Sequence, residues 1–426
     1  MYNFIMYAMQ LGVRIAARFD SKVRKMWRGE QAAFGVLQQR VDPSARYVWF
    51  HAASLGEFEQ GRPLMEAIRR EFPDYKILLT FFSPSGYEVR KDYKGADIVT
   101  YLPIDTVGNA RRFLRTVRPV MAFFVKYEFW YNYLHILNHR GVPTYSVSSI
   151  FRPGQIFFRP YGRQYGRVLR CFSRFFVQNE ESSQLLSSIG IDQVEVVGDT
   201  RFDRVLQVRE AHKQLPLVER FVGDSHRVFV AGSSWLPDEE LFLRYFASHP
   251  EWKLIIAPHV IKEEHLAQIR QLLQGKKVAR YTQSSEETVA DADVLIIDCF
   301  GLLSSVYHYG RVAYVGGGFG VGIHNVLEAA VWGMPVLFGP NNKHFQEAQG
   351  LIAAQGGFEV SDDAGFAQLM DRFTKDEAFL QESAGRAAAF VEKLTGATER
   401  VLQAVKPELE KNCQAQSWSN LERSNK

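Results

Sequence analysis

The stretch VAYVGGGFGVGIHNVLEAAVWGMPV at residues 312–336 decides the fold expected for the second half of this chain. The apolar run at 312–315 predicts a buried strand, and a cluster of glycines directly follows it. A helical pattern then opens with His324 and Asn325 and carries Glu328 one turn later, before a further apolar run. A strand, a turn and a helix that lead into another strand form the βαβ unit of a parallel sheet.

The glycine cluster is typical of a phosphate-binding turn. Glycines let a backbone approach a phosphate closely, and a helix N-terminus favours an anion. Glu328 could accept hydrogen bonds from a ribose diol, as acids do in dinucleotide sites. A Rossmann dehydrogenase is the competing interpretation. It is disfavoured because the glycines lie late in the chain and the first strand-turn, at 47–57, has no G-x-G-x-x-G.

Strands alternate with helical patterns over most of the chain. The strand-like runs lie at 47–53, 76–82, 98–102, 120–125, 144–148, 174–177, 194–197, 227–231, 254–257, 278–280, 294–298, 312–315, 335–338 and 358–360. The alternation breaks at 206–225, which is mostly polar. We therefore expect two successive doubly wound, Rossmann-like α/β domains that face a central cleft, the architecture called GT-B.

Length and composition agree with two globular domains. The 426 residues are 46% hydrophobic and 23% charged, and the net charge is +4. Three widely spaced cysteines favour a reducing compartment over a disulfide framework. The predicted parts are a membrane-associating segment at 1–30, a first Rossmann-like domain at 31–206, a linker at 207–224, a second, nucleotide-binding Rossmann-like domain at 225–406 and a polar tail at 407–426.

The first residues combine an apolar stretch with a basic one. Residues 1–15 are apolar and aromatic, and Arg14, Arg18, Lys22, Arg24, Lys25 and Arg28 follow with Asp20 as the only acid among them. A secretory signal would place its positive charges first. The apolar run is also shorter than the about 20 residues that span a bilayer. We expect a helix that lies on an anionic membrane surface; a helix packed on the protein is the alternative.

Polar side chains follow several strands of the first half. His51-Ala-Ala-Ser-Leu-Gly-Glu57 is a strand-to-helix turn, so Glu57 should lie where open α/β sheets bind ligands. Its carboxylate could accept a proton from a hydroxyl, or it could simply cap the helix. The segment 80–87 could likewise hold a phosphate or sugar, or cap a helix. The charges of Lys126 and Glu128 directly follow an apolar strand, so they should face the cleft or pair.

Two further patterns are ambiguous. Residues 151–178 hold six arginines and several aromatic residues without an acid until the stretch ends, which suits an anionic amphiphile, a nucleic acid or a solvated surface. Asp291-Ala-Asp293 has the D-x-D pattern of some metal-dependent glycosyltransferases, but it precedes a strand, and we interpret it as a loop.

Together these segments resemble the 3-deoxy-D-manno-octulosonic acid (Kdo) transferases of lipid A biosynthesis. The resemblance is carried, in order, by 51–57, 80–86, Glu128-Phe-Trp, Gln178-Asn-Glu-Glu181, 198–203, Ala257-Pro-His259, 316–328 and Gly339-Pro340. No single motif is decisive, but the ordered set is specific and extends over nearly the whole chain.

The resemblance implies a GT-B fold and an inverting transfer of Kdo from CMP-Kdo to a lipid A precursor (lipid IVA) at the cytoplasmic face of the inner membrane. The domain at 31–206 would bind the acceptor, and the domain at 225–406 would bind the CMP-sugar. CMP-Kdo would be a co-substrate, with no resident cofactor, no metal and no nucleic-acid partner. The resemblance implies Glu57 as the general base and Lys126, Glu128 and Arg201 as further catalytic positions. The implied CMP-binding residues are Pro258, His259, Phe300, Gly301, Leu302, Asn325, Val326, Leu327 and Glu328.

The chain departs from the family pattern at three positions. Lys126 stands where the family usually has an acid, Arg201 where it has a lysine, and His259 where it has an arginine. Arg201 stays cationic and can still stabilise negative charge. We hypothesise that Lys126 contacts the donor carboxylate or an acceptor phosphate. A histidine at 259 would weaken donor binding or make it depend on pH.

Two other functions remain as alternatives. One is a GT-B enzyme that uses a UDP-sugar. The other is a non-catalytic basic protein that binds lipid or nucleic acid through 151–178, which would leave Glu57 and the 316–328 block without a role.

Overall fold

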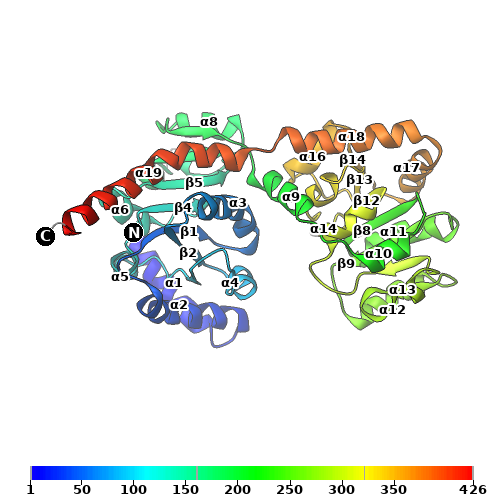
Figure 1. Cartoon of the computed structure of the whole chain (residues 1–426), viewed down its shortest axis with the longest axis horizontal. Coiled ribbons are helices and arrows are strands. Elements are labelled where there is room, and N and C mark those ends of the chain that lie inside the picture. The colour runs from blue at the N-terminus through cyan, green and yellow to red at the C-terminus, as the bar shows by residue number, and fades with distance from the viewer. Residues whose placement is uncertain (1, 160–161, 321, 425–426) are drawn as a thin grey trace. The chain divides into compact units, whose positions relative to one another are not determined.

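The computed structural model describes residues 2–159, 162–320 and 322–424, without the side chains of 163, 164 and 412–424. The chain divides into two compact units. The first comprises Met1–Arg204 and Thr395–Lys426, and the second comprises Val205–Leu394 (Figure 1).

The first unit is built on a parallel sheet of seven strands. They are β1 (Arg46–Ala52), β2 (Tyr75–Phe81), β3 (Ile98–Tyr101), β4 (Met121–Val125), β5 (Thr144–Ser149), β6 (Arg174–Val177) and β7 (Val194–Val196). Their order is β3-β2-β1-β4-β5-β6-β7, so the strand order reverses between β1 and β4. Ligands of open α/β sheets bind beyond the carboxyl ends of the strands at such a switch point.

Both faces of this sheet are buried, which explains why its strands are continuous apolar runs. Side chains of successive β1 residues point to opposite faces. Tyr47 and Trp49 belong to one core cluster, and Val48 and Phe50 belong to the other. Helices cover the two faces (Figure 1).

The helical segments of the first unit connect these strands. They are α1 (Tyr2–Ala16), α2 (Ser21–Arg40), α3 (Leu55–Glu71), α4 (Pro84–Arg90), α5 (Val107–Val117), α6 (Tyr131–His139), η1 (Ile156–Phe158), α7 (Arg163–Gly166), η3 (Arg167–Cys171), α8 (Glu180–Ser187) and α19 (Ala397–Ser424). Helix α9 (Thr200–Glu210) runs from the first unit into the second.

The second unit repeats this plan. Its parallel strands are β8 (Val228–Ser234), β9 (Lys253–Pro258), β10 (Val278–Arg280), β11 (Val294–Ile296), β12 (Val312–Val315), β13 (Val336–Phe338) and β14 (Gly357–Glu359). The order is β10-β11-β9-β8-β12-β13-β14, with the reversal between β8 and β12. All fourteen strands of the described residues coincide with predicted runs, so the two doubly wound sheets are confirmed.

Helices also connect the strands of the second unit. They are α10 (Pro216–Val222), α11 (Leu236–Ala247), α12 (Glu263–Leu272), η4 (Tyr281–Gln283), α13 (Glu286–Val289), α14 (Leu303–Val306), η5 (Tyr307–Tyr309), α15 (Leu327–Ala330), α16 (Gln346–Ala353), α17 (Asp363–Lys375) and α18 (Glu377–Lys393).

The C-terminal part of the chain differs from the prediction. Residues 395–406 belong to the first unit, not to the nucleotide-binding domain, and the predicted polar tail is helical up to Ser424. In α19 the side chains of Val401, Leu402, Val405 and Leu409 are fully buried in a core cluster of the first unit. Their helical spacing gives α19 one apolar face, and that face needs an apolar partner. Residues 425–426 of the predicted tail lie outside the described residues.

The predicted linker at 207–224 is also structured. Helices α9 and α10 occupy much of it, and Leu215, Val218 and Phe221 are buried. Lys253 donates through Nζ to the carbonyl of Phe221 at 2.5 Å, which ties this segment to β9. The polar composition there reflects the solvent-facing side of packed helices.

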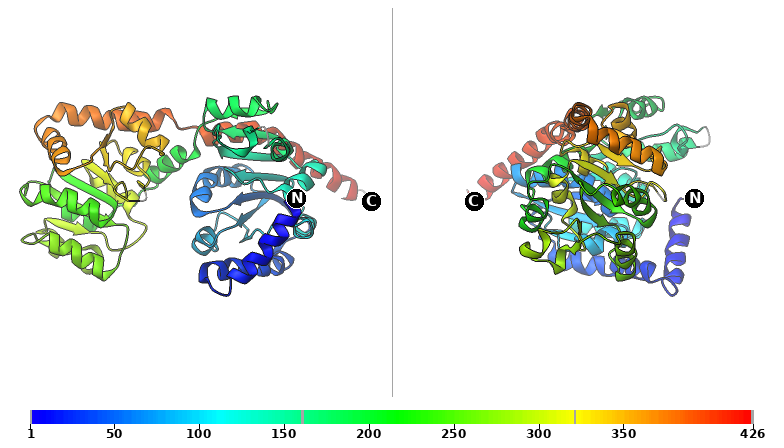
Figure 2. Two further views of the ribbon diagram at one scale, coloured as in Figure 1. Left: turned by 180° about the vertical axis from the view of Figure 1, so that it is seen from behind. Right: turned by 90° about the vertical axis from the view of Figure 1, so that its right-hand side faces the viewer.

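The N-terminal segment forms two helices on the outside of the first unit (Figure 2). Helix α1 buries no side chain, but its start is fixed. The Tyr2 hydroxyl donates to Asp105 at 2.7 Å, and Asn132 donates through Nδ2 to Asn3 at 2.8 Å. Among the described residues, no helix is both long and apolar enough to cross a membrane.

Candidate active site

Glu57 lies at the switch point of the first sheet. Strand β1 carries His51, Ser54 precedes the first residue of α3, and Glu57 is in the first turn of that helix. Its Oε2 accepts the Ser54 N–H at 3.0 Å. Glu57 therefore caps its helix, as the simpler interpretation predicted. It also lies beyond the carboxyl end of β1, which is where a catalytic base was expected.

The surroundings of Glu57 favour its protonated form more than water does. Burial raises the pKa of its carboxyl, and the negative charge of Glu128 raises it further, while the backbone N–H groups of Ala53 and Ser54 lower it. A carboxyl that is partly buried beside a second carboxylate is the arrangement that moves a pKa toward neutral pH. Such a group can accept a proton from a hydroxyl and later release it.

Glu128 follows β4, the strand on the other side of the switch point. Its Oε2 accepts the indole N–H of Trp130 at 2.7 Å and lies 3.2 Å from Nε2 of His51. Neighbouring Lys126 has a φ of 60°, in the left-handed region that side chains disfavour. Backbone strain of this kind is concentrated at functional sites. The structure thus brings His51, Glu57 and Glu128 together from two motifs far apart in the sequence.

Arg201 is held at the same end of the sheet. Its Nε and Nη2 both lie 2.8 Å from Oδ2 of Asp199. Gln60 of α3 donates through Nε2 to Oδ1 of Asp199 at 3.1 Å, and the Thr200 hydroxyl donates to the Gln60 carbonyl at 2.6 Å. These bonds attach the start of α9 to the helix that carries Glu57. The catalytic roles of Glu57, Lys126, Glu128 and Arg201 stay predictions.

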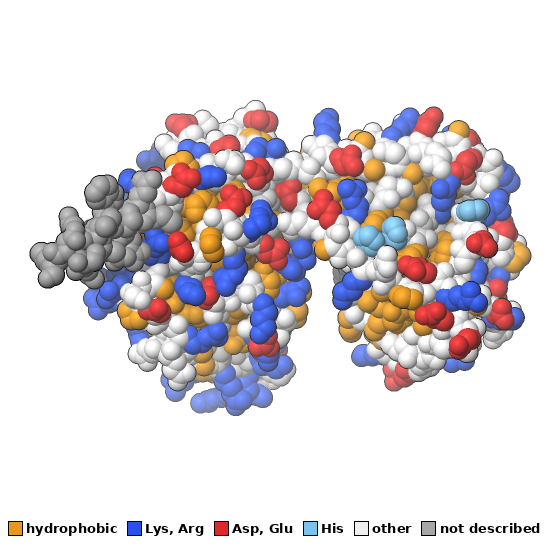
Figure 3. Space-filling view, viewed as in Figure 1, with side chains coloured by type: hydrophobic (Ala, Val, Ile, Leu, Met, Phe, Trp, Pro, Cys, Tyr) orange, Lys and Arg blue, Asp and Glu red, His pale blue; other side chains and the backbone are white. Residues whose placement is uncertain are grey.

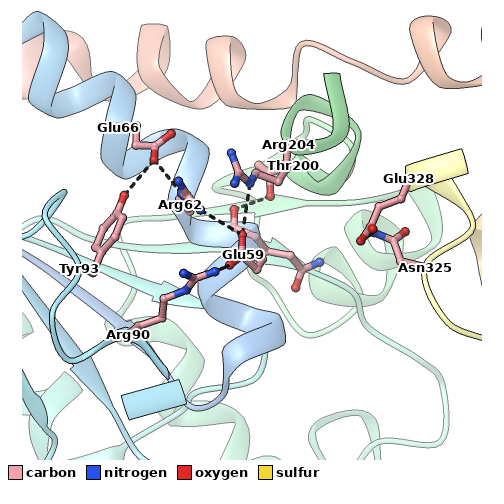
Figure 4. A network of polar contacts seen from close by, with 10 residues as sticks. Glu59, Arg62, Glu66, Arg90, Tyr93, Thr200, Arg204, Asn325 and Glu328 are labelled. Carbon is pink, nitrogen blue, oxygen red and sulfur yellow. Dashed lines mark hydrogen bonds and ion pairs between the residues drawn. The ribbon is translucent and has the colours of Figure 1, made fainter. Parts of the chain in front are cut away.

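An arginine network lies along the same helix (Figure 4). Glu59 accepts from Arg90 at 2.6 Å and from Arg204 at 3.2 Å. Arg62 donates through Nε to Glu66 at 2.7 Å, and the Tyr93 hydroxyl donates to Glu66 at 3.1 Å (Figure 4). Three arginines face two glutamates here, so the network carries a net positive charge near Glu57.

The second motif of the first unit, 80–87, has a structural role. Thr80 is fully buried in β2, and Ser83 is the residue that precedes α4. A side chain at Gly86 would meet the ring of Phe81 at 2.3 Å, so glycine is required there by packing. The simpler interpretation of this motif, a helix start, accounts for most of it.

The predicted nucleotide-binding residues surround the carboxyl ends of the second sheet. Pro258 ends β9, and exposed His259 follows it. Phe300 is 81% exposed, Gly301 has a φ of +85°, and Leu302 precedes α14. Asn325 donates through Nδ2 to Glu328 at 3.1 Å. Val326 and Leu327 are fully buried, so only their backbone could reach a ligand.

The glycine-rich turn after β12 differs from the expected phosphate cradle. The helix begins at Leu327 and ends at Ala330, so it neither opens at His324 nor offers a long helix terminus to an anion. Val321 lies outside the described residues. The glycines have packing reasons, since a Cβ on Gly316 would lie 2.4 Å from the Ser233 carbonyl and one on Gly318 would lie 2.5 Å from Gly339.

Three rings stack beside this turn. The centroids of Trp235 and His259 are 4.7 Å apart, and those of His259 and His324 are 4.4 Å apart, both at interplanar angles of 25°. Burial lowers the pKa of His259, and burial and the neighbouring charge of His259 lower that of His324. The surroundings of both imidazoles therefore disfavour a positive charge on either ring.

The D-x-D motif lies in a loop, as predicted. Asp293 precedes β11, and its Oδ2 accepts the Lys277 N–H at 2.8 Å. This bond ties the loop to the start of β10.

The comparisons with known proteins agree with this geometry. The family model described as 3-Deoxy-D-manno-octulosonic-acid transferase (kdotransferase) matches residues 28–204. The protein of Bordetella pertussis named 3-deoxy-D-manno-octulosonic acid transferase is 28% identical over 398 residues, which are 88% of this chain and 90% of that protein. The protein of the same name from Aquifex aeolicus is 26% identical over 335 residues, covering 77% and 85%. This chain matches the Kdo transferase family model over residues 28–204 and aligns with Kdo transferases over most of its length. It is therefore a glycosyltransferase.

Solved structures support the fold. The crystal structure of UDP-GlcNAc 2-epimerase from Neisseria meningitidis bound to UDP-GlcNAc aligns with a TM-score of 0.63 at 14% identity, over 85% of this chain and 100% of that one. At this identity the likeness concerns the fold alone. Two doubly wound sheets in this arrangement along the chain are the GT-B architecture that the sequence predicted.

Sequence reasoning missed several side chains of this Kdo transferase. The buried Thr80 hydroxyl is hydrogen-bonded to both Trp49 and His51, and nothing in the spacing of these residues along the sequence predicts these bonds. Arg62, Arg90 and Arg204 are scattered in sequence and meet only at Glu59. One signal was available in the sequence. His51 and Thr80 are polar residues within apolar runs that predict buried strands, and buried polar side chains need hydrogen-bond partners.

Proposed function

We propose that this enzyme transfers Kdo from CMP-Kdo to a lipid A precursor, with Glu57 as the general base. The observation that carries the proposal is the position of Glu57 at the switch point of the first sheet, beside Glu128, with a raised carboxyl pKa. Similarity to the Kdo transferase family supports Kdo as the transferred sugar.

In the proposed reaction the acceptor hydroxyl gives its proton to the Glu57 carboxylate. Its oxygen then forms a bond to the anomeric carbon of Kdo while the bond from that carbon to the CMP phosphate oxygen breaks. CMP leaves with the bonding electron pair, and the configuration inverts. Arg201 and the arginines around Glu59 supply positive charge in the same unit, where phosphate groups of the acceptor would be stabilised.

The substrate class is tested by supplying donors in parallel. Purified protein is incubated with a lipid A precursor and either CMP-Kdo or UDP-sugars, and the products are resolved by mass. The proposal predicts Kdo addition from CMP-Kdo alone. Transfer from a UDP-sugar would support the other GT-B function, and binding of nucleic acid without any transfer would support a non-catalytic role.

We further propose that CMP-Kdo is a co-substrate and that the reaction needs no resident cofactor or metal. Dialysis against a chelator should leave the initial rate of transfer unchanged. A rate that falls on chelation and returns with a divalent cation would contradict this.

The acceptor is a lipid, and we propose that the enzyme works on the membrane surface that holds it, at the cytoplasmic face of the inner membrane. Helix α1 exposes an apolar stripe made by Phe4, Tyr7, Leu11 and Ile15, and Phe19 beyond it is 84% exposed. These four residues are spaced three or four apart, so they lie on one side of the helix. An exposed apolar stripe on a surface helix is suited to the interface of a bilayer.

Basic residues stand beside this stripe. Lys22, Lys25 and Arg28 of α2 are exposed, and Lys and Arg side chains gather at the part of the first unit where α2 lies (Figure 3). The arginines at 152, 159, 167, 170 and 174 are also exposed, while Arg163 lies outside the described side chains. Anionic headgroups would be attracted to both basic stretches.

The start of α1 is also close to the site. The rings of Tyr2 and Tyr131 are 5.1 Å apart, and Tyr131 directly follows Trp130, which binds Glu128. A helix held at this point by its first turn would bring the reacting end of a membrane-bound acceptor toward Glu128 and Glu57.

Vesicle sedimentation tests the membrane proposal. The double variant Phe4→Ser, Leu11→Ser should bind vesicles of phosphatidylglycerol much more weakly than the wild type does. Val89→Ser is the matched control, because Val89 is 57% exposed on α4 of the same unit. Equal binding by all three proteins would contradict a membrane role for α1.

A further inference from the structure

His51 is completely buried, and both of its ring nitrogens have a polar neighbour. Nδ1 lies 2.9 Å from the Thr80 hydroxyl, and Nε2 lies 3.2 Å from Oε2 of Glu128 and 3.0 Å from the indole Nε1 of Trp130. A neutral imidazole donates from one nitrogen and accepts at the other, so the tautomer decides what His51 does for each neighbour.

The indole of Trp49 favours a tautomer of His51 in which Nδ1 has no proton and accepts a hydrogen bond from Thr80. An indole N–H can only donate, and that of Trp49 donates to the Thr80 oxygen at 2.8 Å. Thr80 then has its own proton to give. Its possible acceptors are Nδ1 of His51 at 2.9 Å and the Phe50 carbonyl at 3.3 Å, and the shorter contact is to His51.

Glu128 favours a proton on Nε2. A carboxylate oxygen only accepts, so a bare nitrogen 3.2 Å away would place two lone pairs against each other. The Trp130 indole N–H can only donate, and its Nε1 lies 2.7 Å from Oε2 of Glu128 and 3.0 Å from Nε2 of His51. The shorter contact is to Glu128, so with a proton on Nε2 both His51 and Trp130 donate to this oxygen. This assignment of protons gives each hydrogen-bonding group from Trp49 to Trp130 a partner.

We propose that His51 is a positioning residue which, as the neutral Nε2–H tautomer, holds Glu128 beside Glu57. Trp49 and Thr80 set the tautomer, and His51 and Trp130 together fix the carboxylate from two directions. The inference rests on the proposed function for its effect on catalysis, because Glu57 is the group that Glu128 influences. The tautomer itself is a property of the folded protein and can be measured separately.

The tautomer is tested by ¹⁵N NMR of protein labelled at histidine. The His51 signals are assigned by their absence from the His51→Gln variant. The inference predicts a protonated Nε2 and an unprotonated Nδ1 that accepts a hydrogen bond, and it predicts that Thr80→Val shifts the Nδ1 signal. A proton on Nδ1 in the wild type, alone or together with one on Nε2, would overturn the assignment.

The positioning role is tested by kinetics. His51→Phe should lower kcat by about 10- to 100-fold with little change in KM, because a hydrogen bond to a charged group is lost. His51→Gln should recover part of the rate, since its amide N–H can donate to Glu128. His139→Gln is the matched control, because His139 is exposed at the end of α6.

The pH profile separates positioning from mere folding. Glu128→Gln removes the like charge that raises the Glu57 pKa, so the acidic limb of kcat/KM should move to lower pH. His51→Phe should move it in the same direction, because Glu128 is no longer held. An unmoved limb in His51→Phe would overturn the positioning role. Absence of Kdo transfer by the wild type would overturn the proposed function, and the NMR result would still decide the tautomer.

Discussion

Glu30 gives a prediction whose magnitude comes directly from the structure. The side chain lies on α2, is 3% exposed, and has one carboxyl oxygen without a hydrogen-bond partner. Burial raises the pKa of this carboxyl from its ordinary value of 4.5 to about 8. The folded protein therefore keeps a proton on Glu30 at neutral pH that the unfolded chain releases.

The sign follows from proton counting. Between about pH 4.5 and 8 the native state binds one more proton than the unfolded state, so the free energy of unfolding falls as pH rises. Each pH unit is worth at most about 1.4 kcal/mol, and the interval therefore accounts for at most about 5 kcal/mol. Glu30→Gln has no proton to release, so it should lose this pH dependence and be more stable than the wild type at pH 8.

The assay is urea unfolding at several pH values, followed by hydrogen exchange on peptides from β1 and β4. These peptides report the first unit by itself, which matters because a chain of two units need not unfold in one step. Glu88→Gln is the control, because Glu88 is exposed on α4. If the free energy of unfolding changed with pH by the same amount in the wild type and in Glu30→Gln, the reasoning would be refuted.

Three further predictions follow from packing and charge. Leu402→Ala should destabilise the first unit by about 2–5 kcal/mol in the same unfolding assay, because the side chain is fully buried. Gly318→Ala should destabilise the second unit by about 1–3 kcal/mol and so lower its melting temperature, because its Cβ would overlap Gly339. CMP binding measured by calorimetry should weaken as pH rises and His259 loses its charge, and His259→Arg should remove this dependence.

The fold could be predicted from the sequence because parallel strands are buried on both faces. Such strands are short apolar runs, and each run between helical patterns became a strand. Helix α19 could not be assigned in this way. Its apolar residues recur with a helical period, at Val401, Leu402, Val405 and Leu409. This period predicts an apolar helix face, but not which of the two units that face packs against.

The candidate site was predictable in part. Glu57 and Glu128 each follow a strand, and the strand order brings the ends of β1 and β4 together. The contacts of His51 were not predictable, because Thr80 and Glu128 are separated from it by 29 and 77 residues. The glycines at 316–318 suggested a phosphate site, whereas close backbone packing explains Gly316 and Gly318 without a ligand.

The measurement that tests the central claim most directly is Kdo transfer by Glu57→Gln. The variant keeps the size and the Ser54 cap acceptor of Glu57 but has no carboxylate to receive the acceptor proton. We predict that transfer falls by about 10²- to 10⁴-fold while CMP binding is retained. Glu71→Gln, at the far end of α3, should transfer at the wild-type rate. Near wild-type transfer by Glu57→Gln would contradict the role of Glu57 as the base.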